Sequence, residues 1–147
     1  MKKLIVLSSL LLALVSSSFA SGTIAFAGEN HFKKTYAAAT NVTYKQVNEF
    51  TEVNFTLNGE KLQAFYDEEG NLVATSKHIL IAQLPQAAQD CLKSDKYKDF
   101  DVTEVIQYEQ ADNATHSYYI NLENDKQKVI LNVTAKGSIS VFKKSRK

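Results

Sequence analysis

Apolar and polar residues alternate along most of the chain from Val42 onward, which is the pattern of half-buried strands. In residues 52–66, every second residue is apolar on each side of Asn58-Gly59. The apolar positions are Val53, Phe55, Leu57, Leu62, Ala64 and Tyr66. Asn-Gly is typical of a two-residue hairpin turn, because both central residues take positive φ. The pattern predicts two paired strands, followed by a third over residues 71–77.

The same pattern returns near the C-terminus. Aligning "AFYDEEGNLVATSK" (64–77) with "LNVTAKGSISVFKK" (131–144) superimposes Gly70 on Gly137. The apolar positions Leu62, Ala64, Tyr66, Leu72 and Ala74 then fall on Val129, Leu131, Val133, Ile139 and Val141. Upstream, Val53, Phe55 and Leu57 fall on Tyr118, Ile120 and Leu122 if the hairpin loop of the second unit, "ENDKQ" (123–127), is two residues longer than that of the first. We therefore expect an internal repeat, in which Leu72 and Ala74 share the face of the earlier apolar residues.

A short helical segment precedes each set of strands. "ENHFKKTYAAA" (29–39) places Phe32 and Tyr36 one turn apart, and "QLPQAAQDCLKSDKY" (83–97) has Pro85 at its first turn. The sequence thus predicts an α+β fold of two tandem α-β4 units, at about 29–79 and 83–143. Together they would form one domain over 28–147, with one antiparallel sheet and both helices on one face.

The acidic stretch at residues 67–69 belongs to a turn in this interpretation. The second unit has "TAKG" where the first has "DEEG", so the glycine recurs and the acids do not. An EF-hand alignment on Gly70 would put Phe65 and Ser76 at ligand positions that need carboxylates. We expect a hairpin turn, with Gly70 at positive φ, and no metal site.

The first residues have the composition of a signal peptide. Lys2 and Lys3 precede an apolar run over 4–15, and small residues suited to cleavage follow. This run is shorter than the roughly 20 residues that cross a bilayer. We expect a signal peptide over 1–20, with cleavage as late as residue 27. The mature chain would be periplasmic or secreted, without membrane insertion.

The composition limits which classes of partner and which role of the cysteine are expected. With 17 basic and 16 acidic residues the net charge is +1, which argues against a nucleic-acid partner. Cys91 is the single cysteine and shares a helical stripe with Leu84, Ala87 and Ala88, so a buried apolar role is expected. The C-terminal "FKKSRK" (142–147) is interpreted as a solvated tail.

The usual motifs of catalysis are absent from the sequence. His31, His78 and His116 lie in separate segments, and the chain has no H-E-x-x-H motif, Gly-rich phosphate loop or G-x-S-x-G motif. The sequence therefore predicts no catalytic residue, no metal and no cofactor, and the protein is expected not to be an enzyme.

The open face of the predicted sheet mixes polar residues with a few large apolar ones. Its polar positions are Asn54, Thr56, Gln63, Asn121, Asn132, Thr134, Ser138 and Ser140. Among them stand Phe65, Tyr119, Ile130 and Phe142, the candidate partner-binding residues. Rigid aromatic side chains among adaptable polar ones are typical of recognition surfaces. Cross-strand pairing that only stabilises the sheet is the alternative.

Several segments carry a family resemblance. "YAAATNVTY" (36–44), the strand–turn–strand over 50–79, "LPQAAQDCLKSDKYKDFDVTEVIQYEQADNATHSYYINL" (84–122) and the closing "VTAKGSISVF" (133–142) resemble the PepSY-like, beta-lactamase-inhibitor-protein-like (BLIP-like) exported domains of Bacteroidetes-type bacteria. The resemblance spans the expected mature chain. It implies the same two-unit fold and binding rather than catalysis, although the inhibitory loop residues of the inhibitors find no match here.

Three functional hypotheses follow. The first is an exported, non-catalytic binding module that takes a protein or peptide on the open sheet face, for example as an inhibitor of an envelope or extracellular hydrolase. The second is a structural envelope protein that self-associates. The third is a small-ligand binder or an unrecognised hydrolase, which would need an enclosed pocket with converging polar groups.

Overall fold

The computed structural model describes residues 26–147, so the expected signal peptide over 1–20 lies outside the described residues. The first unit contains α2 (Glu29–Thr35), β1 (Thr40–Val47), β2 (Phe50–Leu57), β3 (Glu60–Tyr66) and β4 (Leu72–His78). A short 3-10 turn, η2 (Ile81–Gln83), leads into the second. That unit contains α3 (Gln86–Leu92), β5 (Asp101–Gln110), β6 (His116–Glu123), β7 (Gln127–Thr134) and β8 (Ile139–Arg146).

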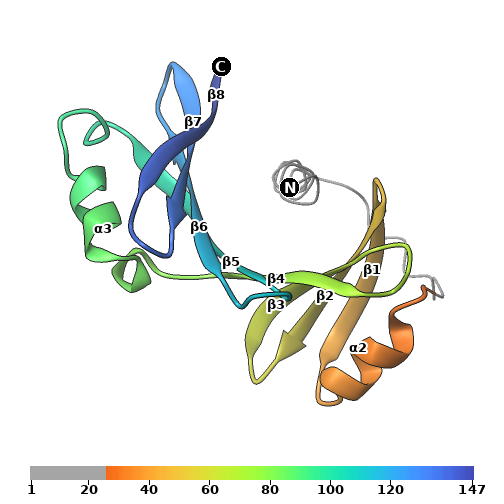
Figure 1. Cartoon of the computed structure of the whole chain (residues 1–147). Coiled ribbons are helices and arrows are strands. Elements are labelled where there is room, and N and C mark those ends of the chain that lie inside the picture. The colour runs from red at the N-terminus through yellow and green to blue at the C-terminus, as the bar shows by residue number, and fades with distance from the viewer. Residues whose placement is uncertain (1–25) are drawn as a thin grey trace.

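The strands form one antiparallel sheet in which β1 to β8 follow one another in chain order. Figure 1 shows that the sheet is strongly curved and that α2 and α3 lie on its outer side. We call this side the convex face and the opposite side the concave face. The arrangement confirms the α+β fold, with an α-β4 unit used twice and both helices on one face.

Each helix covers its own core on the convex face. Phe32 of α2 packs into a cluster with Val53, Phe55, Ala64 and Tyr66. Leu84, just before α3, and Ala88, within it, pack into a second cluster with Tyr97, Val105, Ile120, Leu122, Val129, Leu131 and Val133. These are largely the apolar positions that the repeat predicts, and Cys91 packs against the second cluster as expected. Burial of apolar area in these two clusters is the main force that stabilises the fold.

The hairpin turns follow the local sequence. Asn58 and Gly59 have φ values of 52° and 84°, which confirms the positive-φ turn between β2 and β3. In the turn between β3 and β4, Gly70 has a φ of 84°. The side chain of Asp67 accepts hydrogen bonds there from the backbone and side-chain amides of Asn71, at 2.8 and 3.1 Å. The acidic stretch therefore builds a turn, as the comparison of the two units predicts.

One expectation is wrong, and a second is right about exposure but wrong about structure. Ala74 pairs with Phe65 and faces the concave side, not the face of Leu72, because the register of β3 and β4 shifts between Phe65 and Tyr66. A bulge of this kind reverses the face of every later residue in the strand. The C-terminal stretch is not a free tail: residues 142–146 belong to β8, where Arg146 pairs with Gln127 of β7. Its exposed basic side chains instead mark the edge of the sheet.

No helix among residues 26–147 is long and apolar enough to cross a membrane.

Candidate functional site

Four aromatic rings lie in sequence across the concave face, each on a different strand. Phe65 of β3 lies 6.0 Å from Tyr108 of β5, measured between ring centroids. Tyr108 lies 6.4 Å from Tyr119 of β6, which lies 5.3 Å from Phe142 of β8. We call these four residues the aromatic row. The row joins the two units, because Phe65 belongs to the first and the other three to the second.

The members of the row differ in exposure. Phe65 and Tyr108 are only 5% and 4% exposed, in a cluster with Val47, Phe50 and Ala74. Tyr119 and Phe142 are half-buried and present part of each ring to the surface. The buried pair therefore supports the row, and the half-buried pair is its accessible part.

The four candidate partner-binding residues predicted from the sequence thus lie on one face of the sheet, but they differ in solvent exposure. Phe65, Tyr119 and Phe142 are connected through Tyr108. Ile130 of β7 is half-buried between Asn121 of β6 and Lys143 of β8 in the same register of the sheet. Whether these residues contact a partner stays a prediction.

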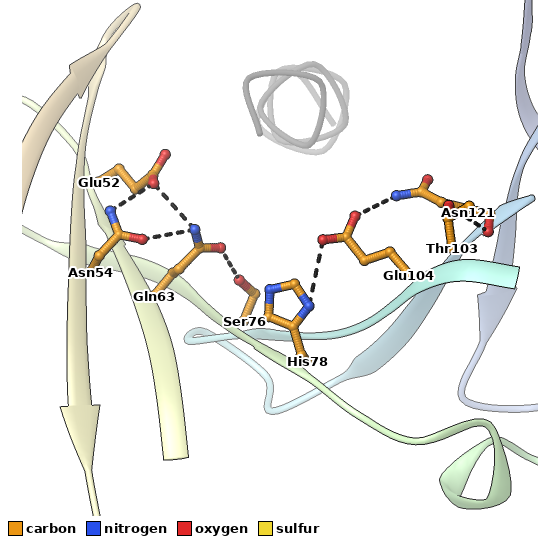
Figure 2. Close-up of polar contacts among 8 residues, drawn as sticks. All are labelled: Glu52, Asn54, Gln63, Ser76, His78, Thr103, Glu104 and Asn121. Carbon is orange, nitrogen blue, oxygen red and sulfur yellow. Dashed lines mark hydrogen bonds and ion pairs between the residues drawn. The ribbon is translucent and has the colours of Figure 1, made fainter. Parts of the chain in front are cut away.

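A connected set of polar side chains lies beside the row on the first unit, and we call it the amide network. Glu52 of β2 accepts hydrogen bonds through Oε1 from Asn54 Nδ2 at 2.8 Å and from Gln63 Nε2 at 3.2 Å. Gln63 Nε2 also donates to Asn54 Oδ1, at 2.9 Å, and Ser76 Oγ donates to Gln63 Oε1, at 2.8 Å. Figure 2 shows these side chains on the same side of the sheet, with the amides of Asn54 and Gln63 directed toward the carboxylate and Ser76 directed toward Gln63. A hydrogen-bonded chain of this kind is rigid, since each bond polarises the next.

A second polar group lies where β4 meets the second unit. Glu104 of β5 accepts a hydrogen bond from Asn121 of β6 and lies 3.5 Å from Nδ1 of His78 on β4. Figure 2 shows Glu104 between these two partners, across from the amide network. Both oxygens of Glu104 therefore have partners within the protein.

Tyr108 carries a hydroxyl that is buried and makes no hydrogen bond within the described structure. Burial raises the pKa of this hydroxyl, so it stays protonated at neutral pH. Burial also raises the pKa of Tyr119, an effect that a hydrogen bond with Ser117 opposes. An unpartnered buried hydroxyl costs roughly 1–3 kcal/mol and calls for an explanation.

The described residues do not assemble a catalytic constellation. The three histidines stand on separate elements beside different partners: His31 near Tyr66, His78 near Glu104 and His116 near Glu109. Among residues 26–147, no group of three His, Cys, Asp or Glu side chains is placed to hold a metal ion. The concave face can bind by shape, by stacking and by hydrogen bonds.

Sequence reasoning missed five residues of this face: Glu52, Ser76, His78, Glu104 and Tyr108. Ser76 and His78 follow the bulge in β4, so simple alternation puts them on the wrong side. In β5 the adjacent residues Val105 and Ile106 are both buried, so the strand shows no clean alternation. The pairing of Ser76 with Tyr108 depends on the β4–β5 register, which a long connection leaves unspecified in the sequence.

No protein-family model matches the sequence, and no curated protein matches it. Solved structures share the fold, however. The chain is similar to a BLIP-like protein from Bacteroides fragilis, with 20% identity, a TM-score of 0.68, and 86% of this chain and 89% of that one covered. It is also similar to a DUF2874 family protein from Bacteroides ovatus, with 22% identity, a TM-score of 0.72 and coverage of 86% and 89%.

A third structure, a protein from Bacteroides eggerthii that is provisionally described as periplasmic, has 16% identity and a TM-score of 0.73. It covers 85% of this chain, and 90% of that one is matched. At such identities the likeness establishes the fold alone. The BLIP-like part of the resemblance is confirmed at that level, whereas the PepSY-like part stays a prediction.

Proposed function

We propose that this chain is an exported, non-catalytic binding module that docks a protein or peptide on the concave face of its sheet. The observation that carries the proposal is the aromatic row, which spans both units and ends in two partly exposed rings, Tyr119 and Phe142. Tyrosine and phenylalanine contribute large contact areas and lose little side-chain entropy, which is why interfaces are enriched in them.

The polar groups around the row support the same function. The amide network and the Glu104 group hold amides and carboxylates in hydrogen-bonded positions on the same face as the rings. Preorganised hydrogen-bonding groups around an apolar centre favour affinity, because little ordering is needed on binding. The likeness to a BLIP-like protein and to a protein provisionally described as periplasmic supports an exported binding role.

Inhibition of an envelope or extracellular hydrolase is the concrete form of this proposal. The mechanism would be occlusion, in which the concave face covers a convex part of the target and excludes its substrate. This chain needs no reactive group of its own for that role.

The test is affinity capture from matched cell-envelope and culture-medium extracts, with the chain from residue 21 as bait. The variant Tyr119→Ala/Phe142→Ala removes the accessible rings and leaves the buried Phe65 in place. Leu80→Ala/Ile81→Ala is the matched control, since it removes exposed apolar side chains from the connection between β4 and α3. We expect one partner that is lost with the first variant and kept with the second. Equal capture by all three chains would contradict the proposal.

Self-association, the structural alternative, is tested by light scattering on the same chains. The edge strand β8 carries Lys143, Lys144 and Arg146 as exposed residues. Charged edges of this kind oppose strand-to-strand pairing between molecules. A concentration-independent monomer supports the binding module, and a stable oligomer that persists in the double variant supports the structural alternative.

A further inference from the structure

Positive charge is concentrated at one end of the molecule, although the net charge of the chain is only +1. Residues 123–147, which include β7 and β8, hold seven basic and two acidic residues. Residues 26–122 hold eight basic and 14 acidic residues. Figure 1 shows β8 at one end of the curved sheet and α2 at the other. The fold thus separates a basic end from an acidic remainder, which favours an anionic partner for the basic end.

Four cations at this end make no ion pair. Glu123 engages two others, Lys128 at 3.0 Å and Lys147 at 2.5 Å. Hydrogen bonds from Lys147 and Lys128 lower the pKa of Glu123, so this carboxylate is ionised at neutral pH. The exposed cations that none of the ion pairs among residues 26–147 includes are Lys126, Lys143, Lys144 and Arg146, and we call them the basic edge.

The basic edge lies along the last strand of the sheet. Among the described strands β8 pairs only with β7, so its outer side has no neighbour. Lys143 lies opposite Ile130, on the concave side, and the next residue, Lys144, is on the convex side. Lys126 is next to the end of β8, since the backbone N–H of Lys147 donates to its carbonyl oxygen at 3.1 Å. A flat anionic surface that approached the edge would therefore meet cations from both faces.

Protection against strand pairing does not account for this density of charge. The other edge strand, β1, has the sequence "TNVTYKQV", in which Lys45 is the single charged residue. One charge and an irregular register serve at that edge. The strand β8 carries three cations, and Lys126 adds a fourth from a turn. Like charges held this close repel one another unless an anion lies between or beside them. The excess points to binding.

An apolar side chain on the same strand indicates which anionic surface fits. Val141 is 48% exposed and is one of three large apolar side chains that are exposed among residues 26–147. It lies two residues before Lys143 on β8. Apolar side chains beside lysine and arginine are typical of segments that bind the interface of a bilayer, where the stems of the basic residues also cover apolar surface. A soluble polyanion would engage the cations and leave Val141 in water.

We propose that the basic edge, together with Val141, docks this chain on an anionic phospholipid surface without insertion into the bilayer. The outer side of β8 lies against the headgroups, and the four cations lie close to the lipid phosphates. Each cation near such a surface strengthens binding by about fivefold. This inference does not depend on the proposed function, because it uses neither the aromatic row nor the amide network.

The test is co-sedimentation of the chain from residue 21 with vesicles of phosphatidylcholine, with or without phosphatidylglycerol. We expect binding only to the vesicles that contain phosphatidylglycerol, and high salt should weaken it at least about tenfold because exposed charges are screened. Equal binding to both vesicles, or binding to neither, would overturn the inference. Binding to soluble polyphosphate without binding to vesicles would also overturn it. This comparison needs no variant.

Variants of opposite sign locate the effect. Lys143→Gln/Lys144→Gln/Arg146→Gln removes three cations of the basic edge and should weaken vesicle binding at least about tenfold. Glu123→Gln releases the two lysines that this carboxylate engages and should strengthen vesicle binding about threefold or more. Unchanged binding in both variants would place the contact elsewhere and overturn the assignment.

The matched control removes the same charge from other parts of the surface. Lys34→Gln/Lys61→Gln/Lys93→Gln changes three exposed lysines on α2, on β3 and after α3. It should bind vesicles as the parent chain does. Thermal melts and light scattering show whether each variant is folded and monomeric. Equal weakening by the two triple variants would mean that net charge alone determines binding, and it would overturn the role of the edge.

Discussion

Ser76 of β4 lies directly opposite Tyr108 of β5, at the seam where the first unit pairs with the second. This pair connects the amide network of one unit to the aromatic row of the other. A repeat that only duplicated a fold would need no such continuity. The pairing therefore explains how two α-β4 units present one continuous concave surface.

The hydroxyls of Tyr66 and Tyr108 are expected to respond in opposite ways to removal. Tyr66 Oη is 3.0 Å from His31 Nδ1, whereas Tyr108 Oη has no partner among the described residues. Tyr66→Phe should cost about 1 kcal/mol of unfolding free energy, and Tyr108→Phe should leave it unchanged or raise it by about 1 kcal/mol. Urea denaturation of both variants measures the difference. A loss of stability in Tyr108→Phe equal to that in Tyr66→Phe would mean that the Tyr108 hydroxyl is satisfied.

Stability should fall at alkaline pH. Burial raises the pKa of Tyr66 and of Tyr108 in the folded chain, above the value of about 10 of a solvated tyrosine. The unfolded chain then loses its tyrosine protons first, so unfolding becomes easier as the pH rises through about 10. Melting temperatures between pH 8 and 11 should show this decline, with a shallower slope in Tyr108→Phe. A slope identical to that of the parent chain would contradict the role of Tyr108.

Alanine substitutions at two glycines with the same φ distinguish the cost of backbone strain from the cost of a steric clash. Gly59 and Gly70 both have a φ of 84°, but a Cβ at Gly59 meets open space and one at Gly70 would lie 2.5 Å from the carbonyl carbon of Ala27. Gly59→Ala should cost about 1 kcal/mol, from backbone strain alone. Gly70→Ala should cost at least about 1 kcal/mol more, because backbone must move. Chemical denaturation of the two variants is the measurement, and equal costs would show that residues 27 and 70 are not in contact.

The start of the mature chain should matter for stability. Phe26 packs on Tyr44 and Tyr66 of the first core, with ring centroids 5.3 and 5.2 Å apart. Cleavage after Ala20 keeps Phe26, and cleavage after Ala27 removes it. A chain from residue 21 should therefore be about 2 kcal/mol more stable than one from residue 28.

Phe26→Ala in the longer chain is the control for that comparison and should reproduce most of the loss. Mass spectrometry of the exported protein identifies the natural N-terminus. Equal stability of the two chains would show that the contacts of Phe26 are not formed in solution.

The features of the fold that depend on neighbouring residues, namely turns and the buried faces of strands, could be predicted from the sequence. Asn58-Gly59 specified a turn by its own backbone preferences, and alternation located the convex core through residues such as Val53 and Ile120. The repeat then predicted both units and the shared helix face. Of the site, it predicted the face and the residues Phe65, Tyr119, Ile130 and Phe142.

The other residues of the site could not be predicted, because their positions depend on strand register and on contacts between distant strands. The bulge near Tyr66 reversed the faces of Ala74 and Ser76, and a bulge cannot be located from alternation alone. Tyr108 became the centre of the aromatic row only through the β4–β5 register. Phe65 looked accessible from its parity, yet the β1–β2 hairpin residues Val47 and Phe50 help to bury it.

The concave face as docking surface is tested most directly by site-specific photo-crosslinking. A benzophenone amino acid replaces Tyr119 on the concave face or, as control, Gln107, whose side chain lies on the convex side of the seam. Each variant is expressed and exported in the bacterium that naturally produces the protein. The cells are irradiated, and covalent adducts of the variant are identified by mass spectrometry. We expect one partner to be crosslinked from position 119 and none from position 107. Crosslinks from position 107 alone, or equally from both, would contradict it.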